Sequence, residues 1–286
     1  MKIELLNRLR KTACWLKNYT PEALIKLDSW RPDAIDLIGP AFDHDWPTPA
    51  PRTIIICAAQ RTGSFELCRF LTAAGLGIPH EYFHPNYARR LMARWSLQEN
   101  PLSEGAIGSY IELLRRKRAS PDVFSTKLQY WQFEAFLRNK HGRALFENAC
   151  VLHLFRSDIV AQFASYRTAS ETGRWDYSER QTNKPNLTPE TEAVEKALDQ
   201  LRHLISADAG FRMLFALLEV CPIFITTEQL FADPQSIIES MARRVALPIN
   251  KNALSKMIAL SSPYSHYAVT EPAIKDLRES FFSSGA

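Results

Sequence analysis

Five residues that could bind an anion follow the first long apolar run of the chain. They are Gln60, Arg61, Thr62, Gly63 and Ser64. Arg61 supplies a cation, and Thr62 and Ser64 supply hydroxyl groups. The apolar run at 54–59 predicts a buried strand, and the spacing after Gly63 predicts a helix. Such a turn directs backbone N–H groups and the positive end of a helix dipole at one point. The pattern predicts a phosphate or sulfate site, although an ordinary strand-to-helix turn would look the same.

The turn differs from the phosphate-binding motifs of kinases and dehydrogenases. The Walker A pattern places Lys and then Ser or Thr directly after its last glycine, because the Lys contacts phosphate and the hydroxyl binds magnesium. Gly63 is instead followed by Ser64 and Phe65. The chain also lacks the G-x-G-x-x-G pattern of dinucleotide-binding folds. These differences disfavour a P-loop kinase and a dinucleotide-dependent enzyme.

Two further cations lie near the ends of other predicted strands. Arg156 follows the apolar run 150–155, and Lys127 lies near the end of an earlier run. An arginine at the end of a buried strand needs an anion, either a bound phosphate or a carboxylate such as Asp158 or Glu228. Lys127 could hold negative charge on a reacting group or form a structural ion pair.

His80, Glu81 and His84 form a cluster of candidate general bases. A free histidine has a pKa close to neutral pH and suits proton transfer better than a free carboxylate. We expect residues 80–85 to lie in a loop just after a short strand, because glycines and prolines bracket the segment. The residues alone leave the choice between His80 and Glu81 open.

Strands that alternate with helices position these side chains. We expect strands, with helices between them, at residues 54–59, 123–128, 150–155 and 222–226. This order predicts an α/β fold with a central parallel sheet and helices on both faces. In such a sheet the carboxyl ends of the strands lie at one edge, so the turn at 60–65 and Arg156 can converge there.

The second half of the chain contains helices and one polar insertion. A helix is expected from Ile159 to about residue 169, and another begins after Thr188 and reaches about residue 220. Between them, the polar residues 171–190 are the best candidate for a mobile lid. Asp233 and Pro234 begin a further helix.

A helical arm precedes the α/β domain. Residues 1–45 contain apolar residues at helical spacing with basic residues around them, and the proline-rich run 47–51 predicts a stiff connector. A basic amphipathic helix could contact a membrane or a second subunit, which would allow a homodimer. We favour an arm that packs on a single α/β domain formed by residues 46–286.

The composition is that of a folded protein that handles small anions. The chain has 286 residues, of which 46% are hydrophobic and 23% charged, and its net charge is +4. This charge is mild, so nucleic acid is not an expected partner. No apolar run approaches the roughly 20 residues of a membrane span, and no signal peptide opens the chain. Five separated cysteines without a C-x-x-C pattern indicate free thiols and a cytoplasmic location.

Two stretches, in order, resemble the donor-binding segments of sulfotransferases. The turn at 60–64 is similar to the loop that binds the 5′-phosphosulfate. The segment from Arg156 to Ser165, which includes Asp158 and Gln162, is similar to the segment that binds the 3′-phosphate. An exposed helical serine would look the same as Ser165.

Two more stretches extend the resemblance over about residues 52–248. Residues 225–234 look like a strand–Glu–Leu–Asp-Pro–helix passage of the same superfamily. The segment His80-Glu81-Tyr82-Phe83 is similar to a Glu-aromatic-Phe signature of the bacterial Stf0-type carbohydrate sulfotransferases.

This resemblance implies a three-layer P-loop-like fold and a chemistry. The donor would be 3′-phosphoadenosine 5′-phosphosulfate (PAPS), which transfers a sulfuryl group to a hydroxyl of a small acceptor, a carbohydrate or glycolipid, and leaves PAP. No metal ion is implied. The residues implied to bind PAPS are Gln60, Arg61, Thr62, Gly63, Ser64, Phe65, Arg156 and Ser165.

The resemblance also implies roles around the acceptor. Glu81 is the base in the Stf0 pattern, with His80 as the alternative, and Lys127 would steady the transferring group. Tyr82, Phe83 and Trp175 are implied to bind the acceptor, and Trp175 could instead stack on adenine.

The chain departs from the superfamily pattern in two places. Phe65 stands where many sulfotransferases have a hydroxyl residue, and residues 261–264 stand where many have a Lys- and Gly-rich segment over the 3′-phosphate. A P-loop-type kinase and a non-catalytic nucleotide-binding protein therefore stay open as alternatives. The second of these would have no use for Glu81.

Overall fold

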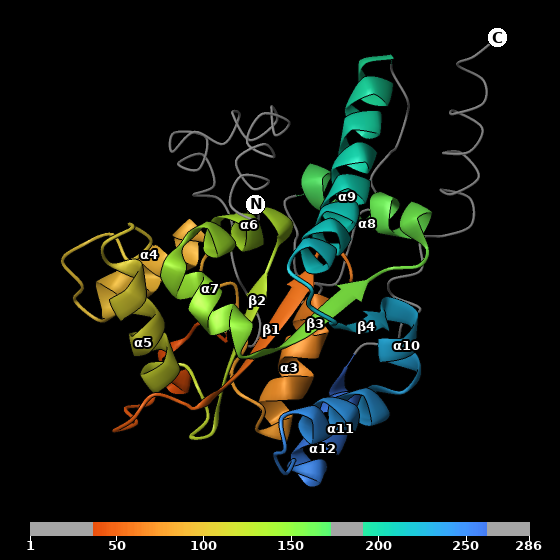
Figure 1. Cartoon of the computed structure of the whole chain (residues 1–286). Helices are drawn as coiled ribbons and strands as arrows, with labels where there is room; N and C mark the ends of the chain where they lie inside the picture. The colour runs from red at the N-terminus through yellow and green to blue at the C-terminus, as the bar shows by residue number, and fades with distance from the viewer. Residues whose placement is uncertain (1–36, 173–190, 262–286) are drawn as a thin grey trace.

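A sheet of four parallel strands forms the centre of the molecule (Figure 1). The structure is a computed structural model and describes residues 37–172 and 191–261. The strands are β1 (Arg52–Ala58), β2 (Val123–Leu128), β3 (Ala149–Phe155) and β4 (Ile223–Thr226). They lie in the order β2-β1-β3-β4, and all neighbouring strands are parallel. The predicted parallel sheet is confirmed, and each predicted strand is present within two residues of its expected bounds.

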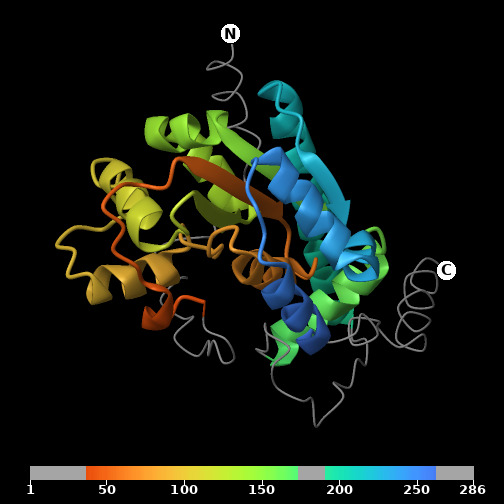
Figure 2. The same ribbon diagram turned by 90° about the horizontal axis from the view of Figure 1, so that it is seen from below.

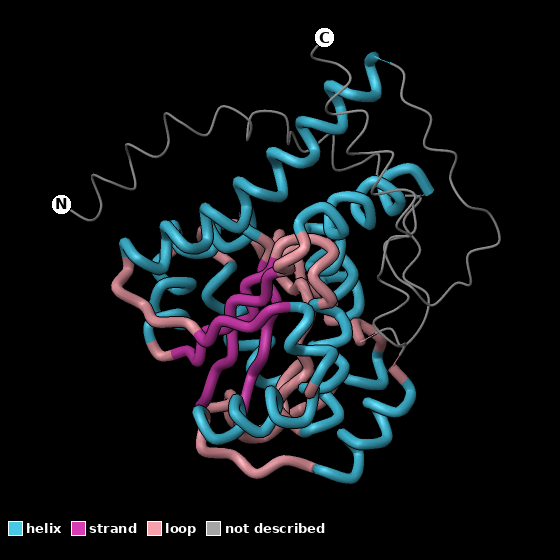
Figure 3. Tube along the Cα trace, turned by 90° about the vertical axis from the view of Figure 1, so that its right-hand side faces the viewer, coloured by secondary structure: helices cyan, strands magenta, loops and turns pink. Residues whose placement is uncertain are grey.

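Helices cover both faces of the sheet (Figures 2 and 3). The helices on one face are α3 (Ser64–Ala74), α11 (Pro234–Arg244) and α12 (Lys251–Leu260). The helices on the other face are α4 (Pro85–Arg94), α5 (Ile107–Lys117), α6 (Tyr130–Arg138), α7 (Lys140–Glu147) and α9 (Thr191–Leu217). Helix α8 (Ile159–Thr172) packs against α9, and α10 (Thr227–Ala232) directly follows β4. The α/β fold with helices on both faces is therefore confirmed.

Strand β1 is buried on both faces because its apolar side chains alternate between the two helical layers. Ile54 and Ile56 belong to the apolar cluster under α3, α11 and α12. Ile55 and Cys57 belong to the cluster on the opposite face. All four side chains are fully buried, which accounts for the continuous apolar run in the sequence.

The carboxyl ends of all four strands lie at one edge of the sheet. The register pairs Cys57 with Leu128 and Ala58 with Leu154, and farther along it pairs Phe155 with Thr226. The residues that follow the strands at this edge are Gln60, Gln129, Arg156 and Thr227. This edge therefore gathers the polar side chains that the sequence places after the strands.

The prediction of a short strand before residues 80–85 is wrong. Helix α3 ends at Ala74 with Gly75 as its C-cap, and the chain from there to His84 forms no strand. Gly77 has a left-handed φ of 89°, and Pro79 has no N–H to donate to a ladder. The segment instead lies along β2, where the backbone N–H of Lys127 donates to the carbonyl of His80 at 3.0 Å.

Arg118 fastens the first described residues to the domain. Its guanidinium is fully buried and donates to the carbonyl oxygens of Leu37 and Gly39. It also forms an ion pair with Asp43 at 2.8 Å and donates to the hydroxyl of Tyr82 at 3.2 Å. The end of the predicted arm is thus tied to the loop that carries Glu81.

Two predicted features lie largely outside the described residues. One is the predicted arm, whose first 36 residues are not described. The other is the predicted lid at 171–190, of which only residues 171 and 172 are described, and they form the end of α8. Within residues 37–172 and 191–261, every helix falls short of the length and apolarity that a membrane span requires.

Candidate active site

The turn after β1 is a tight bend that depends on Gly63. Arg61 and Gly63 both adopt left-handed φ angles, 64° and 76°. A Cβ atom at Gly63 would lie 2.8 Å from the ring of Phe231, so a larger residue would meet both backbone strain and a steric clash. The hydroxyl of Thr62 donates to the carbonyl of Ala59 at 3.0 Å. The hydroxyl proton is therefore used in a hydrogen bond within the turn, which stabilises the turn.

Helix α3 begins in this turn without a side-chain cap. Its N-cap is Gly63, which has no side chain to accept a hydrogen bond. Ser64 is the first residue of the helix and not its cap. The first backbone N–H groups of a helix have no carbonyl partner within the helix, and the helix dipole adds partial positive charge to them. The turn therefore has the backbone arrangement that the sequence predicts for an anion site.

Arg156 lies at the end of β3, and the turn after it is held by a carboxylate. Its side chain is buried, with 4% exposure. Glu228 accepts hydrogen bonds from the backbone N–H groups of Ser157 and Asp158, at 3.2 and 3.3 Å. Burial raises the pKa of Glu228, but hydrogen bonds from its own backbone N–H, from those of Ser157 and Asp158 and from the side chain of Thr226 outweigh it and leave the pKa below its usual value. Glu228 thus fixes the chain beside Arg156.

Helix α8 connects the Arg156 turn to the turn after β1. The Nε of Arg61 donates to the hydroxyl of Ser165 at 2.9 Å. The side-chain amide of Gln162 donates to the carbonyl of Gln60 at 2.7 Å. The structure therefore brings the two predicted anion-binding segments together at the same edge of the sheet.

Thr227 holds these two turns in place, and the sequence analysis did not identify it. Its side chain is fully buried, and its hydroxyl lies 2.9 Å from the carbonyl of Thr62 and 3.2 Å from that of Phe155. A hydroxyl residue directly after a predicted strand was the available signal, since such a residue lies at the functional edge of a parallel sheet.

Glu81 and Lys127 form a buried ion pair beside the turn after β1. The Nζ of Lys127 lies 2.6 Å from Oε1 of Glu81, and their side chains are 3% and 5% exposed. The amides of Gln129 and Gln132 donate to Oε2 of Glu81, at 2.9 and 3.1 Å. Burial raises the pKa of Glu81, but the Lys127 charge, the nearby His84 and the hydrogen bonds from Lys127 and Gln129 together outweigh it and lower the pKa to about 2. The carboxylate is therefore ionised at neutral pH.

Lys127 also contacts helix α3, which begins at the turn after β1. Its Nζ lies 4.1 Å from the ring centroid of Phe65, a distance typical of a cation–π contact. Phe65 stands where the resemblance places a hydroxyl residue, and its ring instead packs against the ammonium group that pairs with Glu81.

His80, the alternative base, is packed among aromatic rings. Its side chain is buried, and its ring centroid lies 4.2 Å from that of Tyr87 in an edge-on arrangement and 6.1 Å from that of Phe65. Burial is the main cause that lowers the pKa of His80 to about 3. The imidazole is therefore neutral at physiological pH.

Tyr82 and Phe83, for which the resemblance implies contact with the acceptor, are buried in the core. Tyr82 is fully buried and its hydroxyl contacts the carbonyl of Ile78. Phe83 packs edge-on against Phe136, with ring centroids 4.9 Å apart. Both side chains anchor the segment that carries Glu81 to the core. Trp175, the third such residue, lies outside the described residues.

Gln129 and Gln132 are further residues that the sequence analysis missed. Both lie at the start of α6, where the backbone N–H of Gln129 donates to the side-chain oxygen of Gln132 at 2.9 Å. The signal was a Gln-x-x-Gln pattern directly after the strand that carries Lys127.

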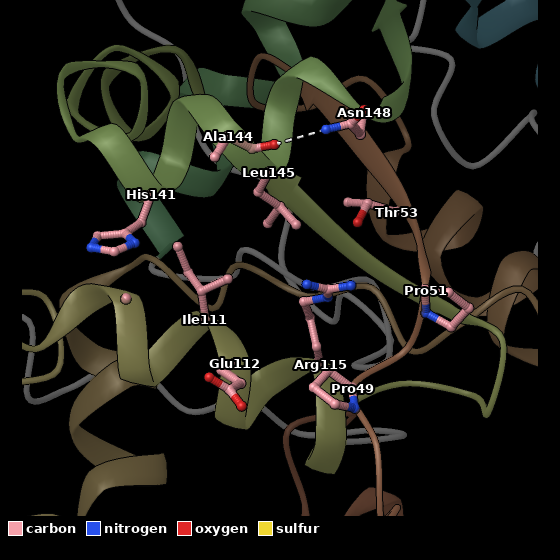
Figure 4. Close-up of a pocket in the computed structure, with 11 residues that line it drawn as sticks. Pro49, Pro51, Thr53, Ile111, Glu112, Arg115, His141, Ala144, Leu145 and Asn148 are labelled. Carbon is pink, nitrogen blue, oxygen red and sulfur yellow. Dashed lines mark hydrogen bonds between the residues drawn. The ribbon is translucent and has the colours of Figure 1, made fainter.

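A pocket at the opposite edge of the sheet does not suit a highly anionic donor (Figure 4). It has a volume of about 410 Å³ and lies where β1 begins, between α5 and α7. The guanidinium of Arg115, which lines it, donates twice to the carbonyl of Ala50, and Glu112 also lines the pocket. The turn after β1 and Arg156 lie at the other ends of the strands.

Comparison with solved structures finds sulfotransferase domains. The sulfotransferase domain from the Synechococcus PCC 7002 olefin synthase is 15% identical, with a TM-score of 0.45 over 81% of this chain and 90% of that chain. The sulfotransferase domain from the curacin biosynthetic pathway is 15% identical, with a TM-score of 0.37 over 71% of this chain and 77% of that chain. Comparison with curated proteins finds no match.

The sequence model of one protein family covers more than half of the chain. The Stf0 sulphotransferase model matches residues 53–262, a range that includes the turn after β1, Glu81, Lys127 and Arg156. The chain therefore belongs to the Stf0 sulphotransferase family.

Proposed function

We propose that this protein transfers a sulfuryl group from PAPS to a hydroxyl group of a small acceptor, with a carbohydrate as the acceptor class. The observation that carries this proposal is the position of the Glu81–Lys127 pair next to the anion-binding turn. Lys127 contacts both Glu81 and the ring of Phe65, the second residue of α3. A candidate base and a cation thus lie at the edge of the sheet where the donor would bind.

The residues at this edge suit a donor with two separated phosphates. Arg61, which bonds to Ser165, lies in the turn that leads into α3, and Arg156 follows the neighbouring strand. Their cationic, hydroxyl and N–H groups are donors of the kind that phosphate and sulfate oxygens accept. When bound, PAPS would supply the sulfuryl group. Its 5′-phosphate would be the leaving group, as part of PAP.

Oε1 of Glu81 is the oxygen that we propose accepts the proton of the acceptor hydroxyl. A carboxylate offers about four lone-pair sites. Among the described residues, Gln129 and Gln132 occupy Oε2 and Lys127 occupies Oε1 once. The remaining site is on Oε1, beside the ammonium group. A low pKa keeps this oxygen ready to accept a hydrogen bond, and the hydroxyl becomes more acidic as its bond to sulfur forms.

Lys127 would serve two partners in the reaction. It is a compact charge that can turn from Glu81 toward negative charge on the leaving phosphate. That movement would also raise the proton affinity of Glu81, because the Lys127 charge is the principal influence that lowers its pKa.

Two partly exposed aromatic rings are our candidates for the acceptor side of the site. Trp131 and His84 pack edge-on with centroids 5.6 Å apart, and the indole N–H of Trp131 lies 3.2 Å from Oε1 of Gln129. An aromatic face with a polar edge suits the mixed apolar and polar surface of a sugar. Trp175 remains a proposed contact for the acceptor or adenine.

Arg156→Ala is expected to remove the preference for PAP over 5′-AMP, which lacks the 3′-phosphate. A charge-assisted hydrogen bond contributes roughly 1.5–3 kcal/mol, so PAP affinity should fall by about 10–150-fold while AMP affinity changes little. Titration of each nucleotide by calorimetry measures both constants.

Arg243→Ala provides the control for this experiment, because Arg243 is exposed on α11. It should bind both nucleotides like the wild type. If Arg156→Ala still prefers PAP by the wild-type ratio, the assignment of Arg156 to the 3′-phosphate is wrong.

A further inference from the structure

The side-chain amide of Gln129 is held in one orientation by three neighbours. Its Oε1 accepts hydrogen bonds from the amide of Gln60 at 2.8 Å and from the indole N–H of Trp131 at 3.2 Å. Its Nε2 donates to Oε2 of Glu81 at 2.9 Å. An indole can only donate and an ionised carboxylate can only accept, so the oxygen and nitrogen of Gln129 cannot exchange places.

This amide is one link in a chain of hydrogen bonds across the edge of the sheet. Gln162, on the helix after Arg156, donates to the carbonyl of Gln60. Gln60 in turn donates to Gln129, and Gln129 donates to Glu81. The chain of bonds follows the order of the strands β3, β1 and β2, which are neighbours in the sheet. It joins both anion-binding segments to the carboxylate.

We infer that Gln129 is a positioning residue that orients Glu81 and links it, through Gln60, to the turn that we propose binds the donor. The inference rests on the proposed function, and it assigns Gln129 no contact with either substrate. Because Gln129 and Gln132 hold Oε2, Oε1 is directed toward Lys127 and the acceptor. Because Gln129 is bonded to Gln60, a shift of the turn on donor binding moves Glu81 as well.

The ionisation of Glu81 gives a readout that a purely structural role of Gln129 would not change. The titratable groups around Glu81 are Lys127 from β2, His80 and His84 from its own loop, and Cys68 from α3. Gln129 is neutral. Gln129→Glu would place a second carboxylate against Glu81 and make ionisation of the pair more costly, which raises the apparent pKa.

Two variants of Gln129 test the inference. Gln129→Leu should lower kcat by roughly 10–100-fold, the effect expected when a catalytic group is misplaced by a fraction of an ångström to 1 Å. PAP affinity should stay near wild type. Gln129→Glu should shift the acidic limb of the pH profile of kcat to higher pH. Glutamate retains an oxygen that can accept from Gln60 and Trp131 as Oε1 of Gln129 does, so it keeps the test available if the Leu variant does not fold.

A double-mutant cycle tests the link to the turn. Gln60→Leu breaks the same bond from the other side, so the double variant Gln60→Leu/Gln129→Leu should turn over no more slowly than the slower single variant. Gln235→Leu, at an exposed position on α11, is the matched control and should behave as wild type. The wild type, the two single variants and the double variant are also compared in free energy of unfolding, measured by denaturant titration.

Wild-type kcat and an unshifted pH profile in both Gln129 variants would overturn the inference, as would effects on kcat that multiply independently in the double variant. If the wild-type protein transfers no sulfuryl group to any acceptor, the proposed function fails instead. The unfolding data then decide the inference, since additive effects of the two substitutions contradict the link and non-additive effects support it.

Discussion

Glu81→Gln is expected to lower turnover by roughly 10²–10⁴-fold, the range that a positioned acid–base group contributes. The substitution keeps the size of the side chain but removes its basicity. PAP affinity should remain near wild type, because the proposed anchors are Arg61, Ser165 and Arg156. Turnover with labelled PAPS and calorimetric titration of PAP measure the two effects separately.

His80→Gln is the matched comparison for this experiment. The ring of His80 is buried against Tyr87, and its pKa of about 3 makes it a neutral core residue. We therefore expect its loss to affect turnover much less than the loss of Glu81. If Glu81→Gln turns over normally and His80→Gln is inactive, the base is His80.

Lys127→Met is expected to destabilise the fold by about 3–5 kcal/mol at neutral pH, the cost of leaving one buried charge of a pair without its partner. Methionine fills a similar volume but cannot compensate the charge of Glu81. The free energy of unfolding from a denaturant titration measures the effect. This is a stability effect separate from the loss of the proposed leaving-group contact, which turnover would report.

The effect of Lys127→Met should depend on pH in a defined direction. In the wild type, the folded pKa of Glu81 is about 2 against a usual value of 4.5. Its contribution to stability is therefore present above pH 4.5 and is lost as the pH falls toward 2. Without Lys127, burial raises the pKa of Glu81, so the carboxyl takes up a proton on acidification. The difference from wild type should shrink between pH 8 and pH 5.

Two controls separate the buried charge from other causes. The double variant Lys127→Met/Glu81→Leu removes both charges and should recover most of the lost stability. Lys251→Met removes the cation of an exposed pair with Glu239, at 3.1 Å, and should change stability little. A deficit in Lys127→Met that is independent of pH and equal in the double variant would contradict the charge explanation.

The strands could be predicted from sequence because their apolar runs are continuous and β-branched. Such runs are distinctive when a strand is buried on both faces, as β1 is. The strand expected before His80 is absent because Gly77 and Pro79 interrupt the pairing, which an apolar run alone does not reveal.

The contacts within the site were predictable only in part. The approach of Arg61 to Ser165 follows from the order of the strands, since both residues come after neighbouring strands. The roles of Thr62 and Gln129 depend on where short side chains point, and a one-dimensional pattern does not encode that direction. For the same reason, Tyr82 resembles an acceptor contact in sequence but lies in the core.

The most direct test of the proposed reaction is transfer of label from PAPS to a panel of sugars, measured in EDTA with the wild type and Glu81→Gln. We expect the wild type to form a labelled sugar and an equal amount of PAP without added metal, because Arg61, Lys127 and backbone N–H groups carry the charge that magnesium carries in kinases. Glu81→Gln should form far less product. Loss of wild-type turnover on chelation that magnesium restores, with ATP as a better donor than PAPS, would contradict the assignment.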